Sequence, residues 1–195
     1  MAVSQEPMKL RDLTRLRAQD AYHEAIRRVG TLAQETRLMV ALSVWGLHGV
    51  TILHVTEGSA ALHANVRAGG SFMMTTTATG RLFTAFHSPA LTEPVIAREI
   101  GENTKGRSQK FDEVRYRNEV EAVRLRGYET TLDLPIPGVS AVTAPVFANS
   151  STMQLAVTVI GPTPQIDLSE QGAIVLTTLG FTKKLSADLG FRQSA

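Results

Sequence analysis

A threonine-rich loop that leads into a helix is the feature of this sequence best suited to bind a ligand. From Val66 to Ala85 the chain reads VRAGGSFMMTTTATGRLFTA, in which a strand end and a glycine turn precede the run from Thr75 to Gly80. Backbone N–H groups and hydroxyls would gather there at a helix N-terminus, whose dipole favours an anion such as a carboxylate. Threonine also caps helices well. Ligand binding and simple capping by Thr75–Thr77 are therefore both open interpretations of this loop.

Two later segments supply strands with small or hydroxyl-bearing side chains. Arg126–Val146 reads RGYETTLDLPIPGVSAVTAPV, and its glycines and prolines fix turns between strands. Its small residues leave room above a sheet and are Ser140, Ala141 and Thr143. Leu155–Pro162 reads LAVTVIGP, which predicts a buried strand with one hydroxyl at Thr158.

Metal and catalytic chemistry find little support in the sequence. The five histidines are His23, His48, His54, His63 and His87. His54 and His63 could lie close across a turn, but no third ligand is evident, so we expect neither a metal nor a cofactor. Phosphate-binding loops, dinucleotide fingerprints, paired helical histidines and nucleophile elbows are all missing, and the carboxylates form no evident acid/base pair. A triad assembled across the fold stays possible from sequence alone, but we expect a protein that is not an enzyme.

Composition limits the class of protein further. The chain has 195 residues, of which 43% are hydrophobic and none is cysteine. This length fits one domain, or one domain with an added helical arm. The lack of cysteine excludes disulfide scaffolds, iron–sulfur clusters and thiolate zinc sites. The net charge of +2 does not suggest a general nucleic-acid coat. The longest apolar stretch, Leu38–Leu47, is too short to span a membrane, and the N-terminus does not resemble a signal peptide, so we expect a cytoplasmic protein.

Hydrophobic periodicity predicts strands and helices in separate blocks, which indicates an α+β fold. A long helix is expected first, over Leu10–Thr36, and its basic stretch from Lys9 to Arg28 is either a solvated face or a linker near DNA. Strands are expected over Leu38–Val44, Val50–Thr56, Ala61–Val66, Tyr128–Leu134, Val139–Phe147 and Met153–Ile160. About six strands would then form one antiparallel sheet covered by helices.

Three shorter helices and a closing one complete this prediction. They are expected over Arg81–Phe86, after Pro89, over Lys110–Arg126, and from Asp167 or Ser169 to Leu189. Gly101–Gln109 is expected to be a mobile loop and Ala148–Ser151 a turn. Gly127 and Gly190 are expected to end the two helices that precede them.

Together, three segments resemble the C-terminal effector-binding domain of the IclR family of bacterial transcriptional regulators. That family shows R-x-G…P-L-H-A-T/S-A-x-G-K-A, then R-G-Y, P-G-V-x-x-I/V-A-A-P-V and a strand ending in S/T-V-x-G-P. The counterparts here are Arg67–Leu82, Arg126-Gly127-Tyr128, Pro137–Val146 and Thr158–Pro162. Each motif is weak alone, but their order and spacing together carry the resemblance, which covers roughly Asp20–Leu189.

The resemblance implies a GAF-like or profilin-like fold with a ligand pocket on one face of a curved sheet. It also implies a homodimer or homotetramer that senses a small molecule and binds operator DNA through a separate winged helix-turn-helix domain. Only about 37 residues precede the first expected strand, and such a domain needs three helices and a hairpin. We therefore expect an excised effector domain: a tail and linker helix over residues 1–19, the effector-binding domain over 20–190 and a tail over 191–195.

The family's ligand positions carry over residue by residue. The backbone amides at the helix entrance match Ala78 and Thr79, with Thr77 just before them. The other matching positions are Thr131, Ala141, Thr158 and Ile160. This chain departs from the family pattern in several places: the usual histidine of the loop is Thr75, its lysine is Arg81, an acidic position is the neutral Thr131, and Ile160 replaces a frequent small hydroxyl residue.

These departures predict a pocket less polar than those that bind very small keto acids. Our hypothesis places a carboxylate on the amides of Ala78 and Thr79, and an aromatic or medium aliphatic body against Met73, Leu132, Ala141 and Ile160. Two other classes stay open, an enzyme on the same layered fold and an interaction module with a vestigial pocket. Turnover of a bound acid would favour the first, and indifference to every small molecule would favour the second.

Overall fold

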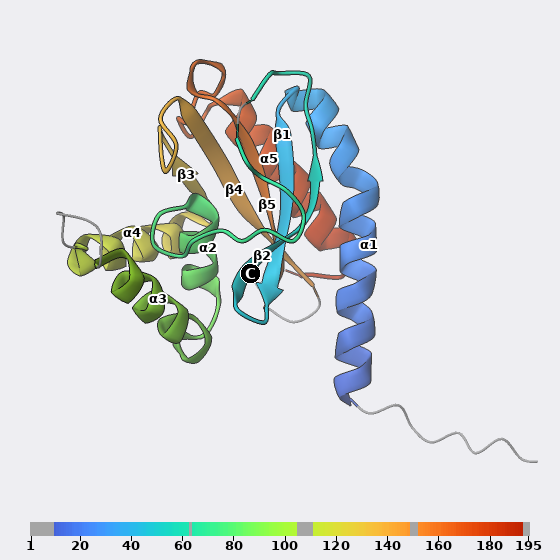
Figure 1. The fold of residues 1–195 in the computed structure, drawn as a ribbon. Coiled ribbons are helices and arrows are strands. Elements are labelled where there is room, and N and C mark those ends of the chain that lie inside the picture. The colour runs from blue at the N-terminus through green and yellow to red at the C-terminus, as the bar shows by residue number, and fades with distance from the viewer. Residues whose placement is uncertain (1–9, 63, 105–110, 149–151, 193–195) are drawn as a thin grey trace, which may run out of the picture.

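One antiparallel sheet organises the chain. The computed structural model describes residues 10–62, 64–104, 111–148 and 152–192. Its five strands are β1 (Met39–Gly46), β2 (Gly49–Thr56), β3 (Glu129–Thr131), β4 (Val139–Phe147) and β5 (Met153–Pro162). They lie in the order β2-β1-β5-β4-β3, and every neighbouring pair is antiparallel (Figure 1). The predicted α+β class with one antiparallel sheet flanked by helices is confirmed.

Helices α1 (Leu10–Thr36) and α5 (Ala173–Asp188) cover one face of the sheet, and the N-terminal part of α1 extends past it (Figure 1). Alternate residues of the central strands turn toward these helices, as the two-residue period of a strand requires. The fully buried core on this side includes Leu42, Val157, Val29, Leu32 and Val175. The long first helix is therefore confirmed, and its second half belongs to the core.

Helices α2 (Ala78–Phe86), α3 (Pro89–Thr104) and α4 (Glu113–Arg126) lie on the other side (Figure 1). Leu82 and Phe83 of α2 and Val120 and Val123 of α4 form a second buried cluster there with strand residues. Helix α4 begins at the cap Asp112, whose Oδ1 accepts a hydrogen bond from Arg115 N at 3.0 Å. It ends, as predicted, at Gly127, whose φ of 85° is easily reached by glycine.

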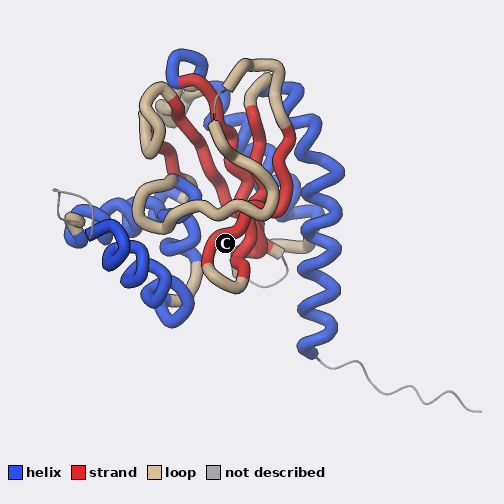
Figure 2. Tube along the Cα trace, viewed as in Figure 1, coloured by secondary structure: helices blue, strands red, loops and turns tan. Residues whose placement is uncertain are grey.

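A long connection between β2 and α2 crosses this second face, and the described residues of the third strand predicted over Ala61–Val66 do not form a strand. Figure 2 shows the connection as a tan loop in front of the sheet. The backbone that pairs with β2 is a later stretch: Ile52 N donates to Gly70 O at 2.8 Å and Phe72 N to Val50 O at 3.1 Å. Leu62 and Val66 are instead partly buried in the loop against the sheet, so their apolar alternation reflected packing without strand pairing.

Several helix boundaries also differ from the prediction. Helix α2 begins three residues early, at Ala78, and α3 runs on to Thr104 where a loop was expected. Helix α5 begins after Gly172 and not after Asp167 or Ser169, because Asp167 Oδ1 accepts from Ser169 N in a preceding turn. Residues 1–9 and 193–195 of the predicted end segments, His63, most of the loop to Gln109 and most of the turn to Ser151 lie outside the described residues. The rest of the predicted linker helix, from Leu10, is the start of α1.

A half-buried histidine predicts how stability depends on pH. The His87 ring stacks on Trp45 and on Phe83, with centroids at 5.4 and 5.1 Å, and the Trp45 and Phe83 centroids lie 6.2 Å apart, so the three rings form one cluster. Burial lowers the pKa of His87 below its usual value of 6.5, so the unfolded chain binds the proton more tightly. Its contribution to stability is complete above pH 6.5 and is lost as the pH falls toward the lowered pKa. We therefore expect the unfolding midpoint to fall between pH 7.5 and 5.5, and to fall less in His87→Phe.

The phenyl ring keeps the aromatic stack and removes the titration. His23→Asn, at an exposed position, is the matched control and should keep the wild-type slope. Equal slopes in His87→Phe and wild type would contradict this assignment.

Candidate functional site

The N-terminus of α2 presents two buried N–H groups that have no acceptor among the described residues. The capping residue is Thr77, whose Oγ1 accepts from Gly80 N at 3.0 Å and whose carbonyl accepts from Arg81 N at 3.2 Å. Within the described part of the chain, the amides of Ala78 and Thr79 donate to no group. Both residues are 2% exposed or less. Buried amides are almost always hydrogen-bonded in native proteins. This pair of N–H groups can therefore donate hydrogen bonds to an anionic ligand.

The loop just before α2 already holds one carboxylate. Glu99 of α3 is buried and accepts from Met74 N at 2.9 Å, from Thr75 N at 3.0 Å and from the Thr75 hydroxyl at 2.9 Å. The Thr77 hydroxyl donates to Met73 O at 2.7 Å as well as capping the helix. Capping, one of the two interpretations, is therefore correct for Thr77. The donors of Thr75 are occupied by Glu99, so the loop is fixed in place beside the two free amides.

A chain of hydroxyls joins α2 to the sheet. Thr79 Oγ1 lies 2.9 Å from Thr158 Oγ1 of β5, and Thr158 Oγ1 lies 2.9 Å from Thr143 Oγ1 of β4. All three side chains are buried. Two site positions predicted on separate segments, Thr79 and Thr158, are thus in direct contact.

Three further predicted positions are neighbours across the sheet. The register pairs Thr131 with Ala141 and Ala141 with Ile160. The pair of Thr143 and Thr158 lies two residues further along the same two strands, β4 and β5. Ala141 and Ile160 belong to an apolar cluster with Met39 and Ile52, which the loop between β2 and α2 covers. The structure therefore brings Ala78, Thr79, Thr131, Ala141, Thr158 and Ile160 to one face of the sheet.

Two predicted apolar contacts lie apart from that cluster. Met73 is 38% exposed, and Leu132 is 58% exposed just beyond the end of β3. Neither packs in the apolar cluster around Ile160. In this conformation they lie at the surface, so they would contact a ligand only at the edge of the site.

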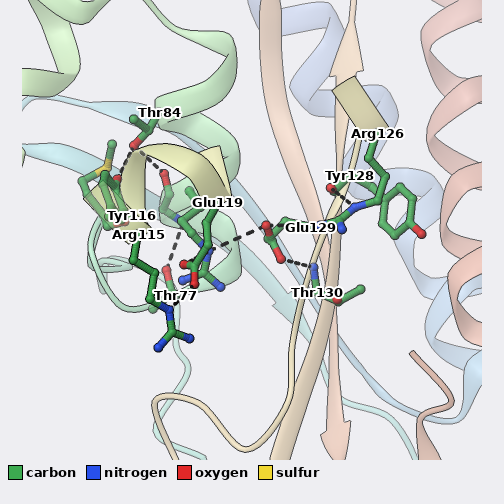
Figure 3. Close-up of polar contacts among 12 residues, drawn as sticks. Thr77, Thr84, Arg115, Tyr116, Glu119, Arg126, Tyr128, Glu129 and Thr130 are labelled. Atoms are coloured by element: carbon green, nitrogen blue, oxygen red, sulfur yellow. Dashed lines mark hydrogen bonds and ion pairs between the residues drawn. The ribbon is translucent and has the colours of Figure 1, made fainter. Parts of the chain in front are cut away.

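A buried charge network supports α2 from the side of the sheet. Arg81 Nε lies 3.7 Å from Glu129 Oε2 and 3.8 Å from Glu119 Oε2, and Arg126 Nη2 lies 3.3 Å from Glu129 Oε2. Figure 3 shows Glu129 between these contacts and its hydrogen bond from Thr130 N. Burial raises the pKa of Glu129 above its usual value, while the Arg81 cation opposes that rise.

Tyr116 ties α4 to the same loop. Its hydroxyl donates to Met74 O at 3.1 Å and lies 2.8 Å from Thr84 Oγ1. Burial raises the pKa of Tyr116 to about 12, so the hydroxyl keeps its proton at neutral pH. Sequence analysis did not identify Glu99, Tyr116 or Glu129 as site residues. Each of them contacts a residue of the loop or of α2 that lies more than 20 positions away in the sequence.

Metal ligands and membrane spans are not found in the described part of the chain. No group of three His, Cys, Asp or Glu side chains comes together there. His54 Nε2 instead lies 3.2 Å from Thr56 Oγ1, and its suggested companion His63 lies outside the described residues. In the same described residues, no helix has the length and apolar character needed to cross a bilayer.

Comparisons with known proteins agree with the fold and the order of the motifs. Residues 13–187 match the model of the bacterial transcriptional regulator IclR C-terminal domain. HmgR of Pseudomonas aeruginosa is 26% identical with a TM-score of 0.79, over 93% of this chain and 72% of that protein. An IclR transcriptional regulator of Alicyclobacillus acidocaldarius is 24% identical (TM-score 0.69; 91% and 73% covered). Thermotoga maritima IclR is 16% identical (TM-score 0.71; 95% and 79% covered). A comparison with curated protein sequences found no match.

Proposed function

Since the chain belongs to the IclR family of bacterial transcriptional regulators, through its C-terminal domain, we propose that it senses a small carboxylic acid. The acid binds at the N-terminus of α2 and controls DNA binding by a separate helix-turn-helix domain. On this proposal residues 20–190 are the effector-binding domain of a cytoplasmic regulator, and the domain binds its effector without catalysing a reaction.

The observation that carries the proposal is the pair of buried amides of Ala78 and Thr79, which donate to no group in the described part of the chain. A carboxylate has two oxygens, so each amide can donate to one of them at the positive end of the helix dipole. Hydrogen bonds to a charged group are about twice as strong as neutral ones. The neighbouring capture of Glu99 by Met74 and Thr75 supports the same chemistry, because it is a carboxylate on loop donors of this segment.

The surroundings favour an acid with an apolar body. Ala141 and Ile160 contribute to the apolar cluster beside the hydroxyls of Thr79 and Thr158. Thr131 is neutral at the position where the family resemblance implies an acidic residue, so the ligand needs no cationic group there. An aromatic or medium aliphatic carboxylate fits these surfaces, with Met73 and Leu132 contacting it only if the loop edges move inward.

The output would be a change in oligomer geometry. A ligand can shift an equilibrium between two assemblies only by the difference in its affinity for them. We propose a homodimer or homotetramer whose two arrangements bind the effector unequally. The separate DNA-binding domains would then be placed at the operator in one arrangement and not in the other.

Replacing Ala78 with proline tests the carboxylate anchor. Ala78 is the first residue of α2 and follows Thr77 in extended conformation, a position where proline is favoured and removes only the N–H. We expect Ala78→Pro to fold and to bind the acid at least about tenfold more weakly, since a hydrogen bond to a charged group contributes about 1.5–3 kcal/mol.

The measurement is thermal unfolding with keto acids, hydroxybenzoates and phenylalkanoates, each beside its matched amide. An acid at 100 times its dissociation constant should raise the wild-type midpoint by roughly 5–10 °C. Ala173→Pro is the control, because Ala173 is the exposed first residue of α5, away from the site. Equal acid binding by Ala78→Pro and Ala173→Pro would refute the anchor, and no shift with any acid would favour an interaction module with a vestigial pocket.

A further inference from the structure

A buried hydroxyl next to the proposed site has no hydrogen-bond partner among the residues that the structure describes. Ser43 of β1 is 0% exposed, and its Oγ makes no hydrogen bond within the described part of the chain. The neighbouring hydroxyls of Thr79, Thr143 and Thr158 are bonded to one another. A fully buried serine without a partner is uncommon, because its hydroxyl loses its bonds to water on folding.

Strand alternation places this hydroxyl on the ligand side of the sheet. Leu42, beside Ser43 in β1, packs in the core under α1 and α5, so Ser43 points to the opposite face. Ala41 shares that face and pairs with Thr158, while Ser43 pairs with Ala156 of the same strand. Ser43 is therefore paired with the residue two positions before Thr158 on β5. The Thr158 hydroxyl contacts Thr79 at the start of α2.

The neighbours of Ser43 along β1 and across to β5 on this face of the sheet are small. Ala41 lies two residues away on β1 and Ala156 is paired with Ser43 on β5, and neither side chain can donate or accept a hydrogen bond. No protein group therefore competes for the Ser43 hydroxyl from these two positions. Ser43 and Thr158 are diagonal neighbours across β1 and β5, and such neighbours lie about 7–8 Å apart. A small molecule bonded to the Thr79 amide, beside Thr158, would reach Ser43 by extending along this diagonal.

From this placement we propose that Ser43 is a second polar contact for the effector, which therefore carries a hydroxyl or keto oxygen besides its carboxylate. The inference rests on the proposed function, because the carboxylate on Ala78 and Thr79 fixes where that second oxygen lies. Ser43 then selects hydroxy and keto acids over their deoxygenated analogues.

Matched acid pairs and the variant Ser43→Ala test this inference. The probes are 3-hydroxybenzoate with benzoate, and 2-oxohexanoate with hexanoate. In wild type we expect the oxygen-bearing member of at least one pair to bind about tenfold more tightly, the effect of one hydrogen bond. In Ser43→Ala that preference should disappear, while the affinity for the deoxygenated member changes less than about twofold.

A second measurement separates ligand contact from a structural role. Because Ser43 has no partner within the described residues, Ser43→Ala should leave the unliganded unfolding midpoint unchanged or higher. Ser186 is the matched control: it is also buried, but its hydroxyl donates to Thr182 O at 2.8 Å and accepts from Phe147 N at 3.0 Å. Ser186→Ala should lower the midpoint by several degrees.

Each outcome decides the inference. Acid binding without a preference for the oxygen-bearing member, or a preference that persists in Ser43→Ala, overturns the role of Ser43 and leaves the carboxylate site standing. A midpoint that falls in Ser43→Ala as far as in Ser186→Ala assigns the hydroxyl a structural role and also overturns it. Failure of every acid to bind overturns both the inference and the function on which it rests.

Discussion

Replacing Arg81 with methionine should destabilise the protein by about 3 kcal/mol, the low end of the range for removing one partner of a buried ion pair. Both Arg81 and Glu129 side chains are 8% exposed, so Glu129 would stay buried without its nearest α2 cation. Arg126 and the amide of Thr130 would still contact Glu129, which keeps the loss from being larger. For a chain of this size the unfolding midpoint should fall by about 6–12 °C.

The pH dependence of this deficit follows from Glu129. Its folded pKa is already raised by burial, and loss of the Arg81 cation raises the pKa further. The stability penalty is thus greatest above that pKa and is relieved as the pH falls through it. We expect the gap between Arg81→Met and wild type to narrow between pH 8 and pH 5.

Two variants control this result. Adding Glu129→Gln to Arg81→Met should recover most of the lost stability, because no buried charge is then left unpaired. Arg117→Met removes a cation whose partner Glu93 is 43% exposed, and should cost less than about 1 kcal/mol. A loss of stability in Arg81→Met as small as that in Arg117→Met would contradict the buried ion pair of Arg81 and Glu129. The absence of any recovery in the double variant would also contradict it.

Replacing Gly80 with alanine should destabilise the protein by about 2–3 kcal/mol and abolish acid binding. A Cβ at Gly80 would lie 2.1 Å from Met73 O and 2.5 Å from Met74 Cα, which are backbone atoms that cannot turn away. The loop would have to move, and it carries the donors that fix the start of α2. Helix propensity alone predicts the opposite sign, a gain of about 1 kcal/mol for alanine.

Gly180 provides the matched control for this substitution. It lies within α5, is exposed, and has open space where a Cβ would project, with no atom within 4 Å. Gly180→Ala should therefore stabilise the protein by about 0.5–1 kcal/mol. Chemical denaturation and acid titration of both variants give the two readouts. A stable Gly80→Ala that binds acid as wild type does would show that the loop is not held against α2.

Much of the fold follows from local sequence signals. Helix ends at Gly127 and Gly190, the hairpin of β1 and β2, and the strands separated by Pro135 and Pro137 all reflect backbone preferences of a few residues. The strand expected over Ala61–Val66 failed because alternating apolar residues also suit a loop packed on a sheet. Local patterns alone do not distinguish these two kinds of burial.

The candidate site shows the same division. The helix entrance at Thr77, Ala78 and Thr79 could be predicted, because a threonine cap and a run of amides are local features. The capture of Thr75 by Glu99 could not, since the two residues meet only when α3 packs beside the loop. The role proposed for Ser43 could not be predicted either, because the sequence does not show whether a serine hydroxyl in an apolar strand has a hydrogen-bond partner.

Amide resonances of Ala78 and Thr79 test the central claim most directly. Two-dimensional ¹H–¹⁵N spectra of the labelled protein would be recorded during titration with each acid that raises the unfolding midpoint, and with its amide. Hydrogen bonds to a carboxylate should move the Ala78 and Thr79 protons downfield by more than other amides, and the uncharged analogue should not. Saturable acid binding that leaves these two resonances in place would contradict the account.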